Sequence, residues 1–115
     1  METFASESTI NQIKEYVKST YNPTRLFLYG LRDNENYRAD SDFDFVMVLS
    51  SFDAKKRLAV MNEIAIQFRH AFNIDVQVWT YSEADFLDWK DEFSSIPETA
   101  LNTGIEIDLN KTKLT

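Results

Sequence analysis

Two acidic residues, Asp42 and Asp44, open the apolar run "DFDFVMVL" with one residue between them. Residues two apart on a β-strand point to the same face, so the two carboxylates are expected to project together. Charge at the mouth of a buried strand is costly unless it is compensated. Hard cations such as Mg²⁺ compensate clustered carboxylate oxygens well. The spacing therefore predicts a divalent metal site.

A third carboxylate, Asp75, is the second residue of the β-branched run "IDVQVW", where a neighbouring strand would supply it. Three acids on adjacent strands can hold two metal ions, which stabilise the attacking and leaving oxygens in phosphoryl or nucleotidyl transfer. In the alternative, structural interpretation, Asp42 caps the strand and Asp44 is solvated. Asp75 then pairs with Arg25 or Arg32. The residues alone leave both interpretations open.

The elements that position these acids follow from hydrophobic periodicity. In the first half of the chain the pattern predicts a helix from Ser8 to about Tyr21, a strand over 25–30, a loop over 31–41 and a strand over 42–49. A long helix follows, and then a strand over 74–80. The last predicted elements are short helices over 82–89 and from Pro97 to Gly104, and a strand over 105–109. The long helix is predicted from an apolar stripe of Ala54, Leu58, Met61, Ala65, Phe68 and Phe72. Trp79, Trp89 and the phenylalanines are predicted to lie in the core.

The order α-β-loop-β-α-β-α-α-β predicts an α/β (α+β) fold with a small mixed sheet of three to four strands and helices packed on it. At 115 residues the chain is long enough for one hydrophobic core. We therefore predict a single domain over residues 1–110 and a loose tail over residues 111–115.

The composition excludes several classes of function. Nineteen acidic and twelve basic residues give a net charge of −7, which disfavours direct binding to nucleic acid or to an anionic membrane. The chain contains no cysteine, so it has neither disulfides nor thiolate metal ligands. No segment resembles a signal peptide or reaches membrane-spanning length. These features predict a cytoplasmic protein.

The stretch "LFLYGLRDNENYRADSDFDFVMVL" resembles the signature of the polymerase-beta-like nucleotidyltransferase superfamily, especially its small stand-alone members. That signature has a strand ending in Gly-Ser, a loop that often holds Arg, and Asp-x-Asp at the start of the next strand. The matching positions here are Gly30, Leu31, Arg32, Ser41, Asp42 and Asp44. Asp75 matches the third carboxylate of the family, which opens a strand after a long helix.

The resemblance implies transfer of a nucleoside monophosphate, usually AMP from ATP, to an acceptor hydroxyl. It implies that Asp42, Asp44 and Asp75 hold Mg²⁺ or Mn²⁺, and that the nucleotide lies near Gly30, Leu31, Arg32 and Ser41. Within this group Arg32 is the candidate for a phosphate contact, and Gly30 for close approach of the backbone. Similar small proteins are often encoded beside an all-helical partner of HEPN type, act as its antitoxin, and in some cases adenylylate it.

The chain departs from the family pattern at two positions of the loop. The phosphate-contacting Ser is Leu31, which cannot donate a hydrogen bond, and a second Gly is Glu35, whose charge repels a triphosphate. Two further interpretations therefore stand beside an active enzyme. One is a non-catalytic module of the same fold that neutralises a helical partner by contact. The other is a structural domain whose acids lie apart.

Overall fold

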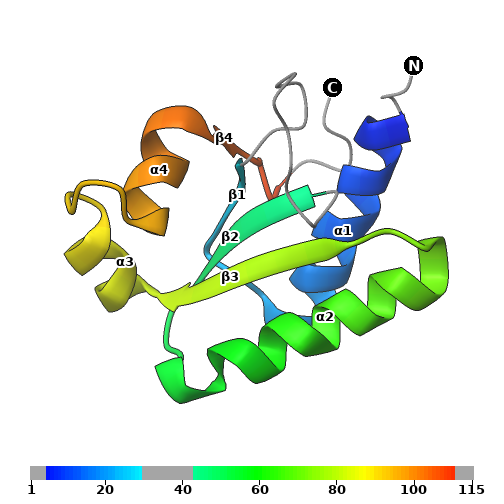
Figure 1. The fold of residues 1–115 in the computed structure, drawn as a ribbon, viewed down its shortest axis with the longest axis horizontal. Helices are drawn as coiled ribbons and strands as arrows, with labels where there is room; N and C mark the ends of the chain where they lie inside the picture. The colour runs from blue at the N-terminus through cyan, green and yellow to red at the C-terminus, as the bar shows by residue number, and fades with distance from the viewer. Residues whose placement is uncertain (1–4, 30–42, 111–115) are drawn as a thin grey trace.

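The computed structural model describes residues 5–29 and 43–110. Their helices and strands are α1 (Ala5–Tyr21), β1 (Arg25–Tyr29), β2 (Phe43–Leu49), the 3-10 helix η1 (Ala54–Lys56), α2 (Arg57–Phe72), β3 (Val76–Ser82), α3 (Glu83–Trp89), α4 (Ile96–Thr103) and β4 (Ile105–Glu106) (Figure 1). The predicted order of elements is confirmed. The predicted loop and the C-terminal tail lie outside the described residues, and the division into one domain and a tail stays a prediction.

The strands form one mixed sheet in the order β3-β2-β1-β4. Strand β1 is antiparallel to β2 and to β4, whereas β2 and β3 are parallel. The predicted fold class, a mixed sheet with helices packed on it, is therefore correct. Strand β2, which follows the predicted acidic pair, lies inside the sheet with neighbours on both edges. Its residues 45–48 are apolar and buried on both faces, as expected for a covered central strand.

Helices cover the two faces of the sheet to different extents. One core lies against α1 and α2 and consists of Ile10, Ile13, Val17, Leu26, Leu28, Phe45, Met47, Ile64, Phe68, Val76, Val78 and Ile107. The smaller core lies under α3 and α4 and consists of Phe27, Val46, Val48, Tyr81, Phe86 and Ala100. Figure 1 shows α3 and α4 gathered at the end of the sheet where β3 finishes. The opposite end, where β2 and β3 begin, lies near the C-terminal end of α2.

Local signals in the sequence fix the ends of the helices. Asn73 adopts a left-handed conformation (φ 56°) that ends α2 and turns the chain toward β3. The hydroxyls of Ser82 and Ser95 accept hydrogen bonds from backbone N–H groups at the starts of α3 and α4. Asp53 caps η1 in the same way. None of the helices in the described ranges is long and apolar enough to cross a membrane.

The predicted apolar stripe of α2 is partly wrong. Met61 and Phe68 are buried as predicted, but the third buried residue is Ile64, which the stripe omitted. Leu58 and Phe72 are instead 67% and 44% exposed. The buried residues of α2 lie between its two ends, so the apolar side chains near those ends are left exposed.

Two further expectations need correction. Trp89, predicted as core, is 50% exposed, and Phe93 is 91% exposed. The last strand contains two residues rather than five.

The Arg25 guanidinium donates two hydrogen bonds of 2.9 Å to the Glu106 carboxylate in β4. These bonds lower the pKa of Glu106, so the pair stabilises the fold at neutral pH. This stabilisation is lost as the pH falls through the lowered pKa.

Candidate functional site

The side chain of Asp44 lies on the face of the sheet that α3 and α4 cover. Alternate residues of β2 share a face, and the next two on the Asp44 side, Val46 and Val48, belong to the smaller core. In the parallel register Asp44 is opposite Gln77 of β3, and in the antiparallel register it is opposite Tyr29 of β1. The acid therefore shares its face with the residues at 77, 79 and 81.

This face is buried at one end and open at the other. Val48 and Tyr81, near the ends of their strands, are buried under α3 and α4. Asp44, Gln77 and Trp79, nearer the starts of their strands, are only half-buried. We call these three residues the open half of the sheet. An acid, an amide and an aromatic ring on an incompletely covered sheet surface are suitable groups for a polar ligand with a planar base.

Asp75 lies at the same end of the neighbouring strand. It directly precedes Val76, which is opposite Phe43 in the parallel register. The backbone N–H of Phe43 donates to the backbone carbonyl of Asp75 at 3.1 Å. Asp44 and Asp75, 31 positions apart in the sequence, are thus brought to adjacent strand starts, the arrangement that their sequence contexts suggested.

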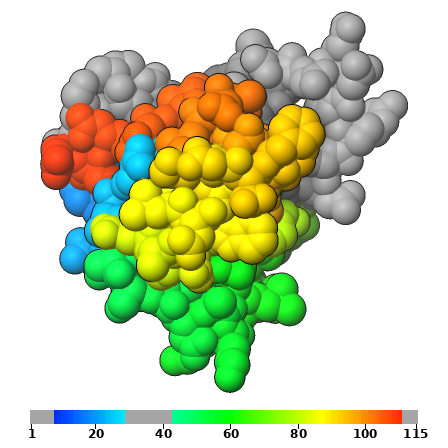
Figure 2. All heavy atoms as spheres, turned by 90° about the vertical axis from the view of Figure 1, so that its left-hand side faces the viewer, coloured from blue at the N-terminus to red at the C-terminus, as the bar shows by residue number. Residues whose placement is uncertain are grey.

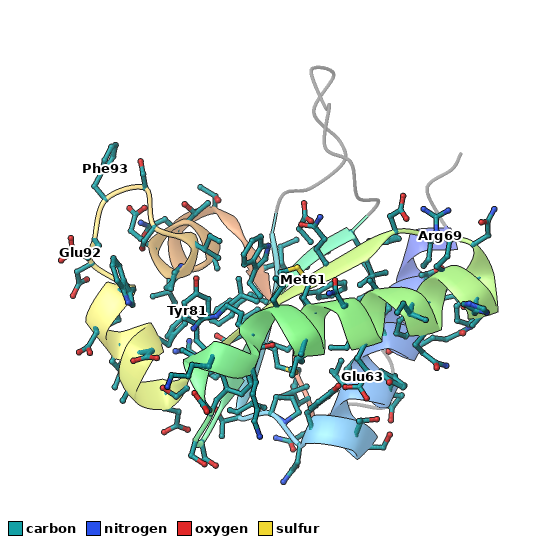
Figure 3. All side chains as sticks on the ribbon, turned by 60° about the horizontal axis from the view of Figure 1, so that its bottom comes forward. Met61, Glu63, Arg69, Tyr81, Glu92 and Phe93 are labelled. Carbon is teal, nitrogen blue, oxygen red and sulfur yellow. The ribbon has the colours of Figure 1, made fainter. Side chains whose placement is uncertain are left out.

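Sequence reasoning missed Arg69, which binds Asp75. The Arg69 guanidinium donates to one carboxylate oxygen of Asp75 and, at 3.3 Å, to the side-chain oxygen of Asn73. Arg69 belongs to the last turn of α2, at the end of the molecule opposite Phe93 (Figure 3). The structural interpretation predicted Arg25 or Arg32 as the partner, but Arg25 pairs with Glu106, and Arg32 lies outside the described residues. A basic residue in the last helical turn, just before an Asn turn, was the available signal.

The residues of the described part fit a hard divalent cation by chemistry. Asp44 and Asp75 contribute carboxylate oxygens and Gln77 an amide oxygen, the donors that Mg²⁺ and Mn²⁺ prefer. Within residues 5–29 and 43–110 no group of three His, Cys, Asp or Glu side chains is close enough to hold a metal ion. The other predicted site residues, which are Gly30, Leu31, Arg32, Ser41 and Asp42, lie outside these ranges. Their roles stay predictions.

Replacing Arg69 with glutamine is expected to tighten Mn²⁺ binding by about fivefold. The substitution removes a positive charge beside Asp75, and two unit charges about 4 Å apart in water interact with about 1 kcal/mol. That energy corresponds to about fivefold in affinity. Both side chains of the ion pair are more than one third exposed, so the free energy of unfolding should change by at most about 1 kcal/mol. Titration with Mn²⁺, with the free ion followed by electron paramagnetic resonance, measures the affinity.

The matched control is Arg25→Gln, which makes the same change of charge at the ion pair with Glu106. Arg25 is opposite Val48, near the end of β2 that lies away from Asp44. Its substitution should leave the Mn²⁺ affinity nearly unchanged. Equal tightening in both variants would mean that only the net charge of the protein matters, and that Asp75 is not a ligand.

Comparison with known proteins agrees with this geometry. The chain matches the protein-family description "Polymerase beta, Nucleotidyltransferase" over residues 11–113. A search of curated proteins and a search of solved structures each gave no significant match. The matched range contains the predicted acidic pair, Asp75 and all four strands. On this match over nearly its whole length, the chain belongs to the polymerase beta nucleotidyltransferase family.

Proposed function

We propose that this chain is a metal-dependent nucleotidyltransferase that transfers AMP from ATP to a hydroxyl of an all-helical, HEPN-type partner protein and so acts as its antitoxin. Family membership supports nucleotidyl transfer as the general reaction. The observation that carries the proposal is the placement of Asp44 and Asp75 at adjacent starts of parallel strands. Paired carboxylates in this position suit metal-assisted chemistry on phosphates.

In the proposed reaction, the acceptor oxygen attacks the α-phosphorus of ATP. A new phosphorus–oxygen bond forms, the bond between the α-phosphorus and the bridging oxygen breaks, and pyrophosphate leaves. Asp75 accepts a hydrogen bond from the acceptor hydroxyl, and the hydroxyl proton is released to water. Mg²⁺ or Mn²⁺, held by Asp42, Asp44 and Asp75, supplies charge neutralisation on the phosphates when it is bound.

The net charge of the chain supports metal dependence. A protein of net charge −7 repels a free triphosphate. A divalent cation held by the proposed ligands Asp42, Asp44 and Asp75 would supply positive charge that offsets this repulsion. Arg32, with a planar fork of donors, is the proposed direct phosphate contact. Gly30, which has no side chain, would let the backbone approach the nucleotide.

A second candidate is a binding module of the same fold without catalysis. Leu31 favours it, because a leucine in place of the family's Ser removes a hydroxyl donor to phosphate. The ion pair between Arg69 and Asp75 favours it as well, since it engages one of the three proposed metal ligands. In this case the chain would neutralise its partner by contact alone.

One experiment separates the two candidates. The chain is incubated with Mg²⁺, ATP labelled with ³²P at the α-phosphate and the protein encoded beside its gene. An active transferase should label the partner, and the mass of the partner should rise by one AMP. ATP labelled at the γ-phosphate is the matched control, because nucleotidyl transfer leaves that label in pyrophosphate. Label from the γ-phosphate on the partner would instead indicate a kinase.

Two other outcomes of this experiment would also decide between the candidates. Stable copurification with no change of mass would favour the binding module. In that case the same assay with Leu31→Ser tests whether the missing hydroxyl is the cause. Absence of both copurification and labelling would contradict the proposed partner and leave only membership of the family.

A further inference from the structure

The end of α3 and the turn after it expose two aromatic side chains. Trp89 is 50% exposed and Phe93 is 91% exposed. Figure 3 shows Phe93 at the tip of the turn, pointing away from the molecule. Figure 2 shows the face formed by α3, in yellow, and α4, in orange, from which this turn projects. Burying a phenylalanine side chain is worth about 1.5–3 kcal/mol, so exposure of this ring forgoes a large stabilisation.

Hydrogen bonds hold the turn in one conformation. The backbone N–H of Glu92 donates to the carbonyl of Trp89 at 3.0 Å, and that of Ser95 donates to the carbonyl of Glu92 at 3.0 Å. The Ser95 hydroxyl also donates to the carbonyl of Trp89 at 2.6 Å. The backbone N–H of Ser94, which has a φ of 68°, donates to the carboxylate of Glu98 at 3.2 Å. Phe93 is thus presented to solvent by a closed turn, and preorganisation of this kind reduces the entropy lost on binding.

The surroundings of the two rings are acidic. Residues 83–92 contain one basic residue, Lys90, and five acidic residues, which are Glu83, Asp85, Asp88, Asp91 and Glu92. Lys90 pairs with its neighbour Asp91 at 3.0 Å. Exposed aromatic rings in an acidic segment repel a second copy of the same surface, nucleic acid and anionic lipid. They attract a surface in which apolar and basic groups are combined.

We propose that Trp89, Phe93 and the acidic residues around them form a docking surface for a protein whose contact face has an apolar pocket ringed by lysine and arginine. Aromatic side chains buried at the centre of an interface contribute much of its binding energy, and charges at the rim select the partner. The surface follows α3, which begins directly after the last residue of β3, whereas Asp75 directly precedes the first residue of that strand. The seven residues of β3 span about 23 Å at a rise of about 3.3 Å per residue. Asp44 and Asp75 are not part of this surface, so the inference holds whether or not the chain transfers nucleotides.

The test uses the full chain and two fluorescent peptides as probes. One is a 14-residue amphipathic helix of leucine and lysine, and the other has glutamate in place of lysine. The lysine peptide should bind, as measured by fluorescence anisotropy, and the glutamate peptide should not. The variant Phe93→Ser keeps the charge of the chain and should weaken binding of the lysine peptide by about tenfold, or about 1.4 kcal/mol.

The matched control is Ile66→Ser, which removes another exposed apolar side chain, 59% exposed, from α2. It should leave the affinity unchanged. Because Phe93 is almost fully exposed, the melting temperature of Phe93→Ser should equal that of the wild type. The proposal is wrong if the lysine peptide does not bind, if both peptides bind equally, or if the two variants behave alike. Dimers that Phe93→Ser dissociates, seen by sedimentation, would assign the surface to a second copy and also overturn it.

Discussion

Replacing Asp44 with asparagine should abolish the rise in melting temperature that Mg²⁺ or Mn²⁺ gives the wild-type chain. A ligand that binds only the folded state stabilises it by about 2.7 kcal/mol at 100 times its dissociation constant. Asparagine has nearly the same shape but lacks the charge that a divalent cation requires. Asp44 is half-buried at the start of β2, so the metal-free variant should remain folded. Thermal melts with and without metal, followed by circular dichroism, measure the shift.

The control for this experiment is Asp91→Asn, which removes an acid whose side chain is 82% exposed on the turn after α3. Its melting temperature should rise with metal as much as that of the wild type. Nucleotidyl transfer by Asp44→Asn should fall by about 10²–10³-fold, as when one preorganised charge-stabilising group is removed from an active site. A metal-induced shift of equal size in both variants would place the metal away from β2.

Replacing Phe45 with alanine should lower the free energy of unfolding by about 3–5 kcal/mol, the usual cost of removing a buried aromatic side chain. Phe45 is fully buried and lies between Leu28 of β1 and Val78 of β3. Domains of this size have a total stability of about 5–15 kcal/mol. The substitution should therefore leave a marginally stable fold. Urea denaturation followed by circular dichroism gives the value.

Phe93→Ala removes the same atoms from an exposed position and serves as the comparison for Phe45→Ala. Its effect should stay within about 0.5 kcal/mol. Phe45→Leu should lie between the two, because leucine fills part of the volume. A loss below about 1 kcal/mol in Phe45→Ala would mean that the larger core does not depend on this ring.

Periodicity predicted the fold well where burial follows the repeat of the element. Strands β2 and β3 lie within two residues of their predicted limits, because both are apolar runs bounded by polar turns. The ends of α2 were less predictable. Leu58 and Phe72 match a helical stripe, but whether they are buried depends on how far the helix extends beyond the sheet. The predicted burial of Trp89 and Phe93 was wrong for a related reason, because hydrophobicity alone does not show where the core ends.

The placement of Asp44 and Asp75 at adjacent strand starts was predictable from their contexts. Asp44 and Asp75 each open an apolar strand, and parallel pairing of those strands brings their starts together. The ion pair with Arg69 was not predictable from spacing on one element. It forms because the left-handed turn at Asn73 reverses the direction of the chain. Asp75, just before β3, then lies beside Arg69 in the last turn of α2. Such a contact depends on the conformation of a single turn residue.

The parallel pairing of β2 and β3 also has a consequence for the kinetics of folding. Parallel neighbours cannot be joined by a hairpin, so the two strand starts meet only when the long connection through α2 is closed. Contacts between residues far apart in sequence form slowly, because the loop between them must first be closed. We therefore expect Asp44 and Asp75 to come together late on the folding pathway. A ligand that bridges them should slow unfolding and leave the folding rate nearly unchanged, which makes the loaded protein kinetically more persistent.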